Sequence, residues 1–334
     1  MMEPIKPSFS SGLAAVLQKY VGMKRALGRQ FNSATHVLQS LDRLLAKDGY
    51  ADLNAAAFAA WGKAQDHLAS GVRRVRMLEV HAFCVYRRRT EPECFLPDPR
   101  TFPPYHQRLR PHIFTESEIT RLLNAASRMK SNPSTPLRPE LTRLAIVLLF
   151  TTGIRRGELL SLTEGDYNRQ ESTLHIRRTK FYKSRLLPVH EGIANEIDRY
   201  LAARAKLKLP SSPGTPLMWN ATRGGRVYTG TGISCCIKPL LHQCGIKAAS
   251  GQSPRIHDFR HSFAVNALLR WYRAGVDVDA KLPLLATYLG HGSAMSTHHY
   301  LHFIEPLRAA AGKRFAKLYG SLIVPMRGKE GCPR

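Results

Sequence analysis

The sequence predicts a mainly α-helical protein with a small β-hairpin or sheet in its second half. This prediction rests on apolar residues at three- and four-residue spacing along most of the chain, on one pair of β-rich segments, and on one proline-rich break. Because 334 residues exceed one ordinary domain, we expect two, an N-terminal helical bundle followed by an α+β domain.

The first hundred residues are predicted to form four helices, with Ser10 or Ser11 capping the first and Ser33 the second. The apolar positions of the four segments are Leu13, Val16, Leu17, Tyr20 and Val21; Val37, Leu38, Leu41, Leu44 and Leu45; Phe58, Trp61 and Leu68; and Val75, Leu78, Ala82 and Val85. The fourth segment also carries the arginines Arg73, Arg74, Arg76, Arg87, Arg88 and Arg89. This charge fits a module that contacts phosphates, and the alternative is a solvated charged face.

A proline-rich and basic segment follows the four helices. Its prolines are Pro97, Pro99, Pro103, Pro104 and Pro111, and its arginines include Arg100, Arg108 and Arg110. We interpret residues 97–112 as a stiff, basic linker. The linker ends where Thr115 and Glu118 have the spacing of a capping box, so a second domain begins near residue 113.

The second domain is predicted to be mostly helical with one hairpin. A buried helix covers residues 141–150 and ends at Gly153, and further helices cover residues 257–272 and 305–318. Residues 173–179 and 185–189 are β-rich and a short turn separates them, so they form the hairpin. The predicted organisation is therefore an N-terminal helical domain over 1–96, a linker over 97–112, a second domain over 113–322 and a tail over 323–334.

The charge of the chain calls for a polyanionic partner. Lys and Arg total 50 and Asp and Glu total 24, which gives a formal net charge of +26. Nucleic acid is the favoured partner. Two less favoured alternatives are that the protein is basic without having a polyanionic partner, and that it binds a membrane surface. The longest apolar run, 144–150, is too short to span a bilayer, and residues 1–11 do not resemble a secretory signal. Six cysteines without metal or redox spacing indicate free thiols, so we expect a cytoplasmic protein.

Two short stretches in the middle of the chain carry charged residues of the types found in catalytic sites. In the first, residues 152–160, a glycine ends one helix and Arg155 begins the next, with Glu158 one turn further on. Arg156 adjoins Arg155 and is the alternative at that position. In the second, the turn of the predicted hairpin carries Lys180, with Lys183 as the alternative. Each stretch alone is a weak signal.

Two further stretches lie closer to the C-terminus. Three-residue spacing places His257 and Arg260 on one face of a helix. Leu-Gly-His at residues 289–291 is followed, nine residues after His291, by Tyr300. A histidine with an arginine three residues on is common by chance, and a lone tyrosine usually packs in a core, so these stretches are also weak singly.

Taken together and in this order, the stretches resemble the signature of the tyrosine recombinase or phage integrase family. The six matching positions are Arg155, Lys180, His257, Arg260, His291 and Tyr300. The resemblance covers roughly residues 113–320 and includes His-Asp-Phe-Arg-His-Ser-Phe-Ala at 257–264. It implies a site-specific DNA recombinase that cleaves and rejoins DNA through a 3′-phosphotyrosine, with its two domains forming a clamp around the duplex.

The resemblance also implies a role for each residue. Two arginines, Arg155 and Arg260, would bind the non-bridging phosphate oxygens, which suits the forked guanidinium. The phenolate of Tyr300 would attack the phosphorus and become covalently attached. The proton of the tyrosine would pass to His257, and Lys180 would protonate the leaving 5′-oxygen.

Two supporting roles follow from the same resemblance. His291 would hydrogen-bond the phosphate, and Glu158 would orient Arg155 or a neighbouring group. No cofactor and no metal are expected, because the chain has no Gly-rich nucleotide loop and few carboxylates near the motifs. Zinc is the less favoured alternative, and its ligands would be His291, His298, His299 and His302.

The expected partners are double-stranded DNA, a homo-tetramer that joins two DNA sites, and accessory DNA-bending proteins. The segment after Tyr300 carries an apolar stripe, which packs either on its own domain or on a neighbouring protomer. Three other functions remain open at this point. They are a catalytically inactive DNA-binding protein of the same fold, a type IB topoisomerase-like enzyme, and a general nucleoid or RNA binder.

Overall fold

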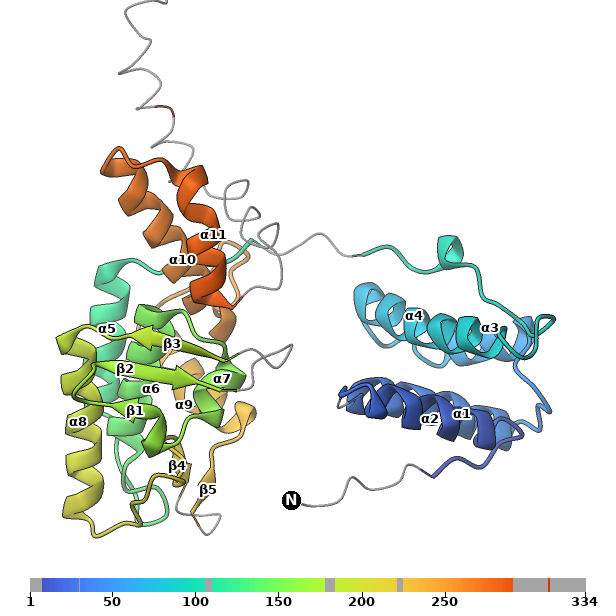
Figure 1. The fold of residues 1–334 in the computed structure, drawn as a ribbon, viewed down its shortest axis with the longest axis horizontal. Helices are drawn as coiled ribbons and strands as arrows, with labels where there is room; N and C mark the ends of the chain where they lie inside the picture. Colours follow the sequence, from blue (N-terminus) through green and yellow to red (C-terminus); the bar gives the residue numbers. More distant parts are fainter. Residues whose placement is uncertain are drawn as a thin grey trace, which may run out of the picture. The chain divides into compact units, whose positions relative to one another are not determined.

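The computed structural model describes residues 8–29, 31–105, 110–177, 184–220, 225–290 and 312. The chain divides into two compact units, residues 1–109 and 110–334 (Figure 1). Helices dominate both units and the strands form only small antiparallel sheets, so the predicted fold class is confirmed. In the part of the chain that the structure describes, no helix is both long enough and apolar enough to cross a membrane.

The N-terminal unit contains the four predicted helices. They are α1 (Ala14–Ala26), α2 (Asn32–Lys47), α3 (Ala55–Lys63) and α4 (Ser70–Arg87), followed by the short 3-10 helix η1 (Pro99–Thr101). Their apolar faces meet in one core that includes Leu17, Leu38, Trp61 and Phe83. The predicted apolar faces of α1 and α2 are buried as expected. The predicted face of the fourth helix is wrong, because Val75 and Val85 are 49% and 44% exposed and α4 buries Met77, Val80, Phe83 and Cys84 instead.

The predicted caps of the first two helices are wrong. Leu13 precedes α1 without a capping side chain, and α2 already begins at Asn32. The Ser11 hydroxyl instead donates to the buried carboxylate of Asp42 at 2.6 Å, and the Ser11 backbone N–H donates to the same oxygen at 3.0 Å. The same hydroxyl accepts the backbone N–H of Leu13 at 3.2 Å, so Ser11 stabilises the turn before α1 and joins it to α2 without capping the helix.

The structure contradicts the assignment of Arg87 to phosphate contact. Arg87 is 7% exposed, and its guanidinium is bonded to the carboxylates of Asp52 and Glu91. Arg74 donates to the carbonyls of Phe102 and Pro103 at 3.1 and 3.2 Å. These arginines hold the N-terminal unit together, whereas Arg88 and Arg89 are exposed at the end of α4.

The first part of the predicted linker packs on the N-terminal helices. Phe102 is 4% exposed, and its ring centroid lies 5.8 Å from that of Phe58. The ring of His81 hydrogen-bonds the carbonyl of Pro97 at 2.8 Å. This part of the predicted linker is therefore packed on the N-terminal core.

The second unit is built around α6 (Arg138–Thr152), which is buried on almost every side. It packs against α5 (Glu116–Ser127), α8 (Glu191–Lys206), α9 (Gly230–Gln243) and α10 (Ile256–Arg273). The remaining helices are α7 (Arg156–Ser161), the 3-10 helix η2 (Glu164–Asp166) and α11 (Val278–Leu289). Figure 1 shows α10 and α11 together at one end of this unit, where their apolar faces form a separate cluster with Leu268 and Leu285.

The predicted hairpin is confirmed. Strands β1 (Tyr167–Asn168), β2 (Thr173–Ile176) and β3 (Arg185–Pro188) form an antiparallel sheet in that order. Ile176 is opposite Arg185 in the register, so Arg185 starts the return strand at the turn end of the hairpin. Strands β4 (Trp219–Asn220) and β5 (Arg226–Val227) pair separately and are too short for residue alternation to predict.

The predicted start of α5 and the predicted end of α6 are both confirmed. The Thr115 hydroxyl accepts the backbone N–H of Glu118 and the Glu118 carboxylate accepts that of Thr115, which is the predicted capping box. Helix α6 ends at Gly153, which has a left-handed φ of 60°. The helix predicted over residues 305–318 lies outside the described residues.

Candidate active site

Three of the six predicted site residues lie within the described part of the chain, and they come from the N-terminal ends of two helices. Arg155 stands directly before α7, whereas His257 and Arg260 lie in the first two turns of α10. The C-terminal end of α11, Leu289 and Gly290, meets both arginines. The other three, Lys180, His291 and Tyr300, lie outside the described residues.

Arg155 is oriented by two partners. Its Nη1 donates to Oε1 of Glu158 at 2.7 Å, and its Nη2 donates to the carbonyl of Gly290 at 2.7 Å. Its backbone N–H also donates to Oε2 of Glu158 at 2.9 Å, which closes the first turn of α7. The neighbouring Arg156 is exposed and extends toward Ser234 on α9, so only Arg155 joins this cluster.

Arg260 is buried, with 1% of its surface exposed. Its Nη1 donates to the carbonyl of Gly153 at 2.7 Å, and its Nη2 donates to the carbonyl of Leu289 at 2.6 Å. These carbonyls belong to the C-terminal ends of α6 and α11, where the helix dipole is negative. The adjacent carbonyls of Leu289 and Gly290 therefore bring the two arginines together.

Two glycines make the close approach of these groups possible. Gly290 has a φ of 66°, and a Cβ there would lie 2.8 Å from Nη1 of Arg185 on β3. A Cβ on Gly153 would lie 2.6 Å from Cδ1 of Phe263. A side chain at either position would displace the groups that surround the arginines.

The first turns of α10 bring two histidine rings together. The ring centroids of His257 and His261 lie 4.7 Å apart in an edge-to-face arrangement. The pKa of His257 is lowered, mainly by partial burial and to a smaller extent by the positive charges of Arg260 and Arg255. Burial and the neighbouring His257 lower the pKa of His261 to about 4. Both rings are consequently neutral at pH 7.

Glu158 is a buried carboxylate with 6% exposure, and Arg155 and Arg185 share it. Burial would raise the pKa of this carboxyl, but the hydrogen bonds from Arg185 and Arg155 outweigh burial and bring the pKa below its usual value. The carboxylate is therefore ionised at neutral pH. Nothing in the sequence marks Arg185, since an arginine on a strand resembles any other surface cation.

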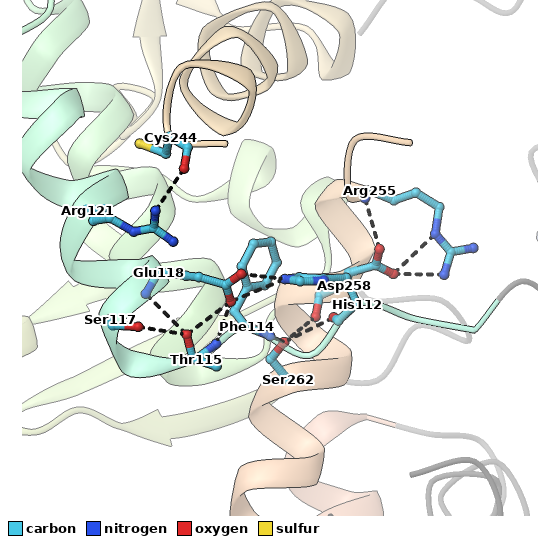
Figure 2. A network of polar contacts seen from close by, with 10 residues as sticks. All are labelled: His112, Phe114, Thr115, Ser117, Glu118, Arg121, Cys244, Arg255, Asp258 and Ser262. Atoms are coloured by element: carbon cyan, nitrogen blue, oxygen red, sulfur yellow. Dashed lines mark hydrogen bonds and ion pairs between the residues drawn. The ribbon is translucent and has the colours of Figure 1, made fainter. Parts of the chain in front are cut away.

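A network on the other side of α10 fixes the start of that helix (Figure 2). Asp258 accepts the backbone N–H of Arg255 at 2.9 Å and its guanidinium at 2.7 Å, which caps α10. The Ser262 hydroxyl accepts the backbone N–H of Phe114 at 2.9 Å and donates to the carbonyl of Asp258 at 2.8 Å. Phe114 also stacks on Phe259, with ring centroids 4.3 Å apart. The helix turn that carries His257 and Arg260 is thus anchored to the segment just before α5.

Comparison with known proteins identifies the kind of site. The model of the phage integrase family matches residues 112–305. The protein y4rB of Sinorhizobium fredii, which carries the name integrase/recombinase, is 30% identical over 303 residues, covering 90% of this chain and 96% of y4rB. Tyrosine recombinase XerA of Thermococcus kodakarensis is 31% identical over 225 residues, covering 67% of this chain and 69% of XerA.

A solved structure shares the fold. The Tn1549 transposon integrase in complex with transposon right end DNA has a TM-score of 0.63 at 16% sequence identity, covering 91% of this chain and 99% of that chain. Together the comparisons define the class of protein, a recombinase that cleaves and rejoins DNA. Within that class, the chain belongs to the phage integrase family of tyrosine recombinases. The comparisons do not favour an inactive DNA-binding protein, a topoisomerase or a general nucleic-acid binder.

Proposed function

We propose that this recombinase exchanges strands between two DNA sites through a 3′-phosphotyrosine formed on Tyr300. The observation that supports the proposal is the meeting of Arg155 and Arg260 at the carbonyls of Leu289 and Gly290. Two guanidiniums held side by side suit the two non-bridging oxygens of one phosphate. In the sequence, Leu289 and Gly290 directly precede the 291–300 segment that carries His291 and Tyr300.

The proposed cleavage step is a transesterification that balances without a cofactor. The phenolate oxygen of Tyr300 forms a bond to the scissile phosphorus, and the bond from phosphorus to the 5′-oxygen breaks. His257 takes the phenol proton, and Lys180 gives a proton to the departing 5′-oxygen. The lowered pKa keeps His257 neutral at pH 7, which a proton acceptor requires. Arg155, Arg260 and His291 would stabilise charge on the phosphate oxygens.

Rejoining is the same step in reverse. The 5′-hydroxyl of the incoming strand attacks the phosphotyrosine and releases Tyr300, so the energy of the broken bond is conserved and no nucleotide is consumed. Glu158 would hold Arg155 in place throughout, as its two bonds to that residue suggest.

The same proposal covers organisation and partners. Residues 1–96 would bind DNA, residues 97–112 would connect the domains, residues 113–322 would form the catalytic domain and residues 323–334 a tail. Four protomers would join two duplexes, with accessory proteins bending the DNA, in the cytoplasm. Integration or transposition is the reaction suggested by the names of the relatives and of the transposon integrase.

The proposed function is tested by covalent trapping. Full-length protein is incubated with a nicked duplex of the sequence that the protein itself enriches from a random pool. Wild type should leave a protein–DNA adduct that survives denaturation. Tyr300→Phe should leave none while its affinity for the duplex is unchanged, since only one oxygen is removed.

The matched control is Tyr288→Phe. Tyr288 stacks on Phe263 with ring centroids 5.3 Å apart, and burial raises its pKa, so it is expected to be dispensable. An adduct formed by Tyr300→Phe but not by Tyr288→Phe would reassign the nucleophile. The tetramer is tested by the mass of the complex that Tyr300→Phe forms with DNA. Four protomers on two duplexes are expected, and a complex with a single duplex would contradict the tetramer.

A further inference from the structure

Arg185 is held against the candidate active site by a two-pronged ion pair. It is the first residue of β3, and its side chain is only 12% exposed. Its Nη1 donates to Oε1 of Glu158 at 3.2 Å and its Nη2 donates to Oε2 at 2.8 Å. Bidentate pairs of this kind fix direction as well as distance.

Each oxygen of Glu158 serves both arginines. Oε1 accepts from Nη1 of Arg155 and Nη1 of Arg185, and Oε2 accepts from the backbone N–H of Arg155 and Nη2 of Arg185. The carboxylate therefore cannot rotate without breaking bonds to Arg185. Its single negative charge is divided between two guanidiniums, so Arg155 retains net positive charge next to Arg185.

Gly290 brings the two guanidiniums close to the same point of the backbone. The position of a Cβ on Gly290 lies 2.8 Å from Nη1 of Arg185 and 3.5 Å from Nη1 of Arg155. The carbonyl of Gly290 accepts Nη2 of Arg155. Arg185 thus occupies the space beside Gly290 and limits where the Arg155 guanidinium can move.

We propose that Arg185 is a positioning residue for DNA cleavage. It fixes the Glu158 carboxylate, and through that carboxylate it holds Arg155 in the orientation in which Arg155 meets the scissile phosphate. Its own charge also prevents Glu158 from neutralising Arg155 completely. This inference rests on the proposed function, because it assigns Arg185 a part in placing a group that stabilises charge on the non-bridging oxygens.

The test compares two substrates that differ in charge at the scissile phosphate. The probe is the nicked duplex described above, with either the natural phosphodiester or a methylphosphonate, in which a methyl group replaces one non-bridging oxygen and removes the negative charge. Full-length Arg185→Met should lose cleavage rate roughly 10- to 100-fold on the phosphodiester at saturating DNA, the range of a small misplacement of a reacting group. On the methylphosphonate, the loss should shrink to within about threefold, since less charge requires stabilisation.

Two further variants make the comparison decisive. Arg185→Lys keeps a cation and the fold but loses the two-pronged geometry, so its loss should also be smaller on the methylphosphonate. Arg143→Met is the matched control, because Arg143 makes a similar pair with Glu196 between α6 and α8, with Nη2 at 2.7 Å and Nε at 3.1 Å from its oxygens. It should cleave both substrates at the wild-type rate.

The outcomes separate the inference from the proposed function. Equal losses on both substrates for the Arg185 variants would mean general structural damage and would overturn the positioning role, as would no loss at all. An adduct formed by wild type in those cases leaves the proposed function standing. Absence of an adduct from wild type would overturn the proposed function and the inference with it.

Discussion

Replacing Arg87 by Met should destabilise the N-terminal unit and leave phosphate binding unchanged. The guanidinium of Arg87 is bonded to Glu91 through Nε at 2.7 Å and to Asp52 through Nη2 at 2.8 Å. Methionine keeps most of the apolar stem in the core but leaves both carboxylates without this partner. The variant therefore tests whether α4 uses this arginine for structure or for DNA.

The size of the effect follows from the exposure of the three side chains. Breaking a fully buried ion pair costs about 3–5 kcal/mol, and an exposed pair contributes about 0–1 kcal/mol. The Arg87 side chain is 9% exposed, whereas those of Asp52 and Glu91 are 47% and 45% exposed and can return to water. We therefore expect a loss of about 2 kcal/mol, or roughly 10 °C in Tm for a unit of this size.

Thermal unfolding of the full chain, with DNA affinity measured over a salt series, is the assay. Arg87→Met should melt at a lower temperature with an unchanged slope of log K against log salt, whereas Arg89→Met, which changes an exposed arginine, should melt like wild type.

The hydrogen bond from Arg87 outweighs burial and lowers the pKa of Asp52, so this stabilisation is lost as pH falls. The difference between wild type and Arg87→Met should accordingly shrink below about pH 4. A structural role for Arg87 is refuted if Arg87→Met has the Tm of wild type and its salt slope falls by about 0.9, the value of one phosphate contact.

Two further predictions concern the candidate active site. Gly290→Ala should slow single-turnover cleavage while DNA affinity is retained. The reason is that its Cβ would lie 2.8 Å from Arg185 and that alanine in the left-handed conformation costs about 1–2 kcal/mol. A wild-type cleavage rate would show that this close approach is dispensable. His261→Gln should flatten the dependence of unfolding free energy on pH. The pKa of His261 is lowered to about 4, so wild-type stability falls as pH drops from about 6.5 toward 4, where the unfolded chain binds a proton that the folded chain does not. Denaturant unfolding at several pH values measures this slope, and an unchanged slope would count against the burial of His261.

Sequence alone determined the elements whose signals are local. The spacing of apolar side chains located the four N-terminal helices, α6 and α10, and the order of the β-rich segments located the hairpin. The capping box at Thr115 and the left-handed glycine at the end of α6 follow from backbone groups within a few residues. The family was also evident from sequence, because four short stretches resemble its signature in the same order along the chain.

Tertiary structure decided which charged groups meet. Nothing near Arg87 in the sequence shows that Asp52, 35 residues away, takes its guanidinium, and nothing near Glu158 shows that Arg185 shares its carboxylate. The carbonyls that hold Arg260 come from residues 107 and 29 positions away. Periodicity reports which face of an element is buried, but the partner of a buried charge depends on how separate elements pack. Because a buried charge is stable only with such a partner, packing decided which arginines support the fold and which are held at the candidate active site.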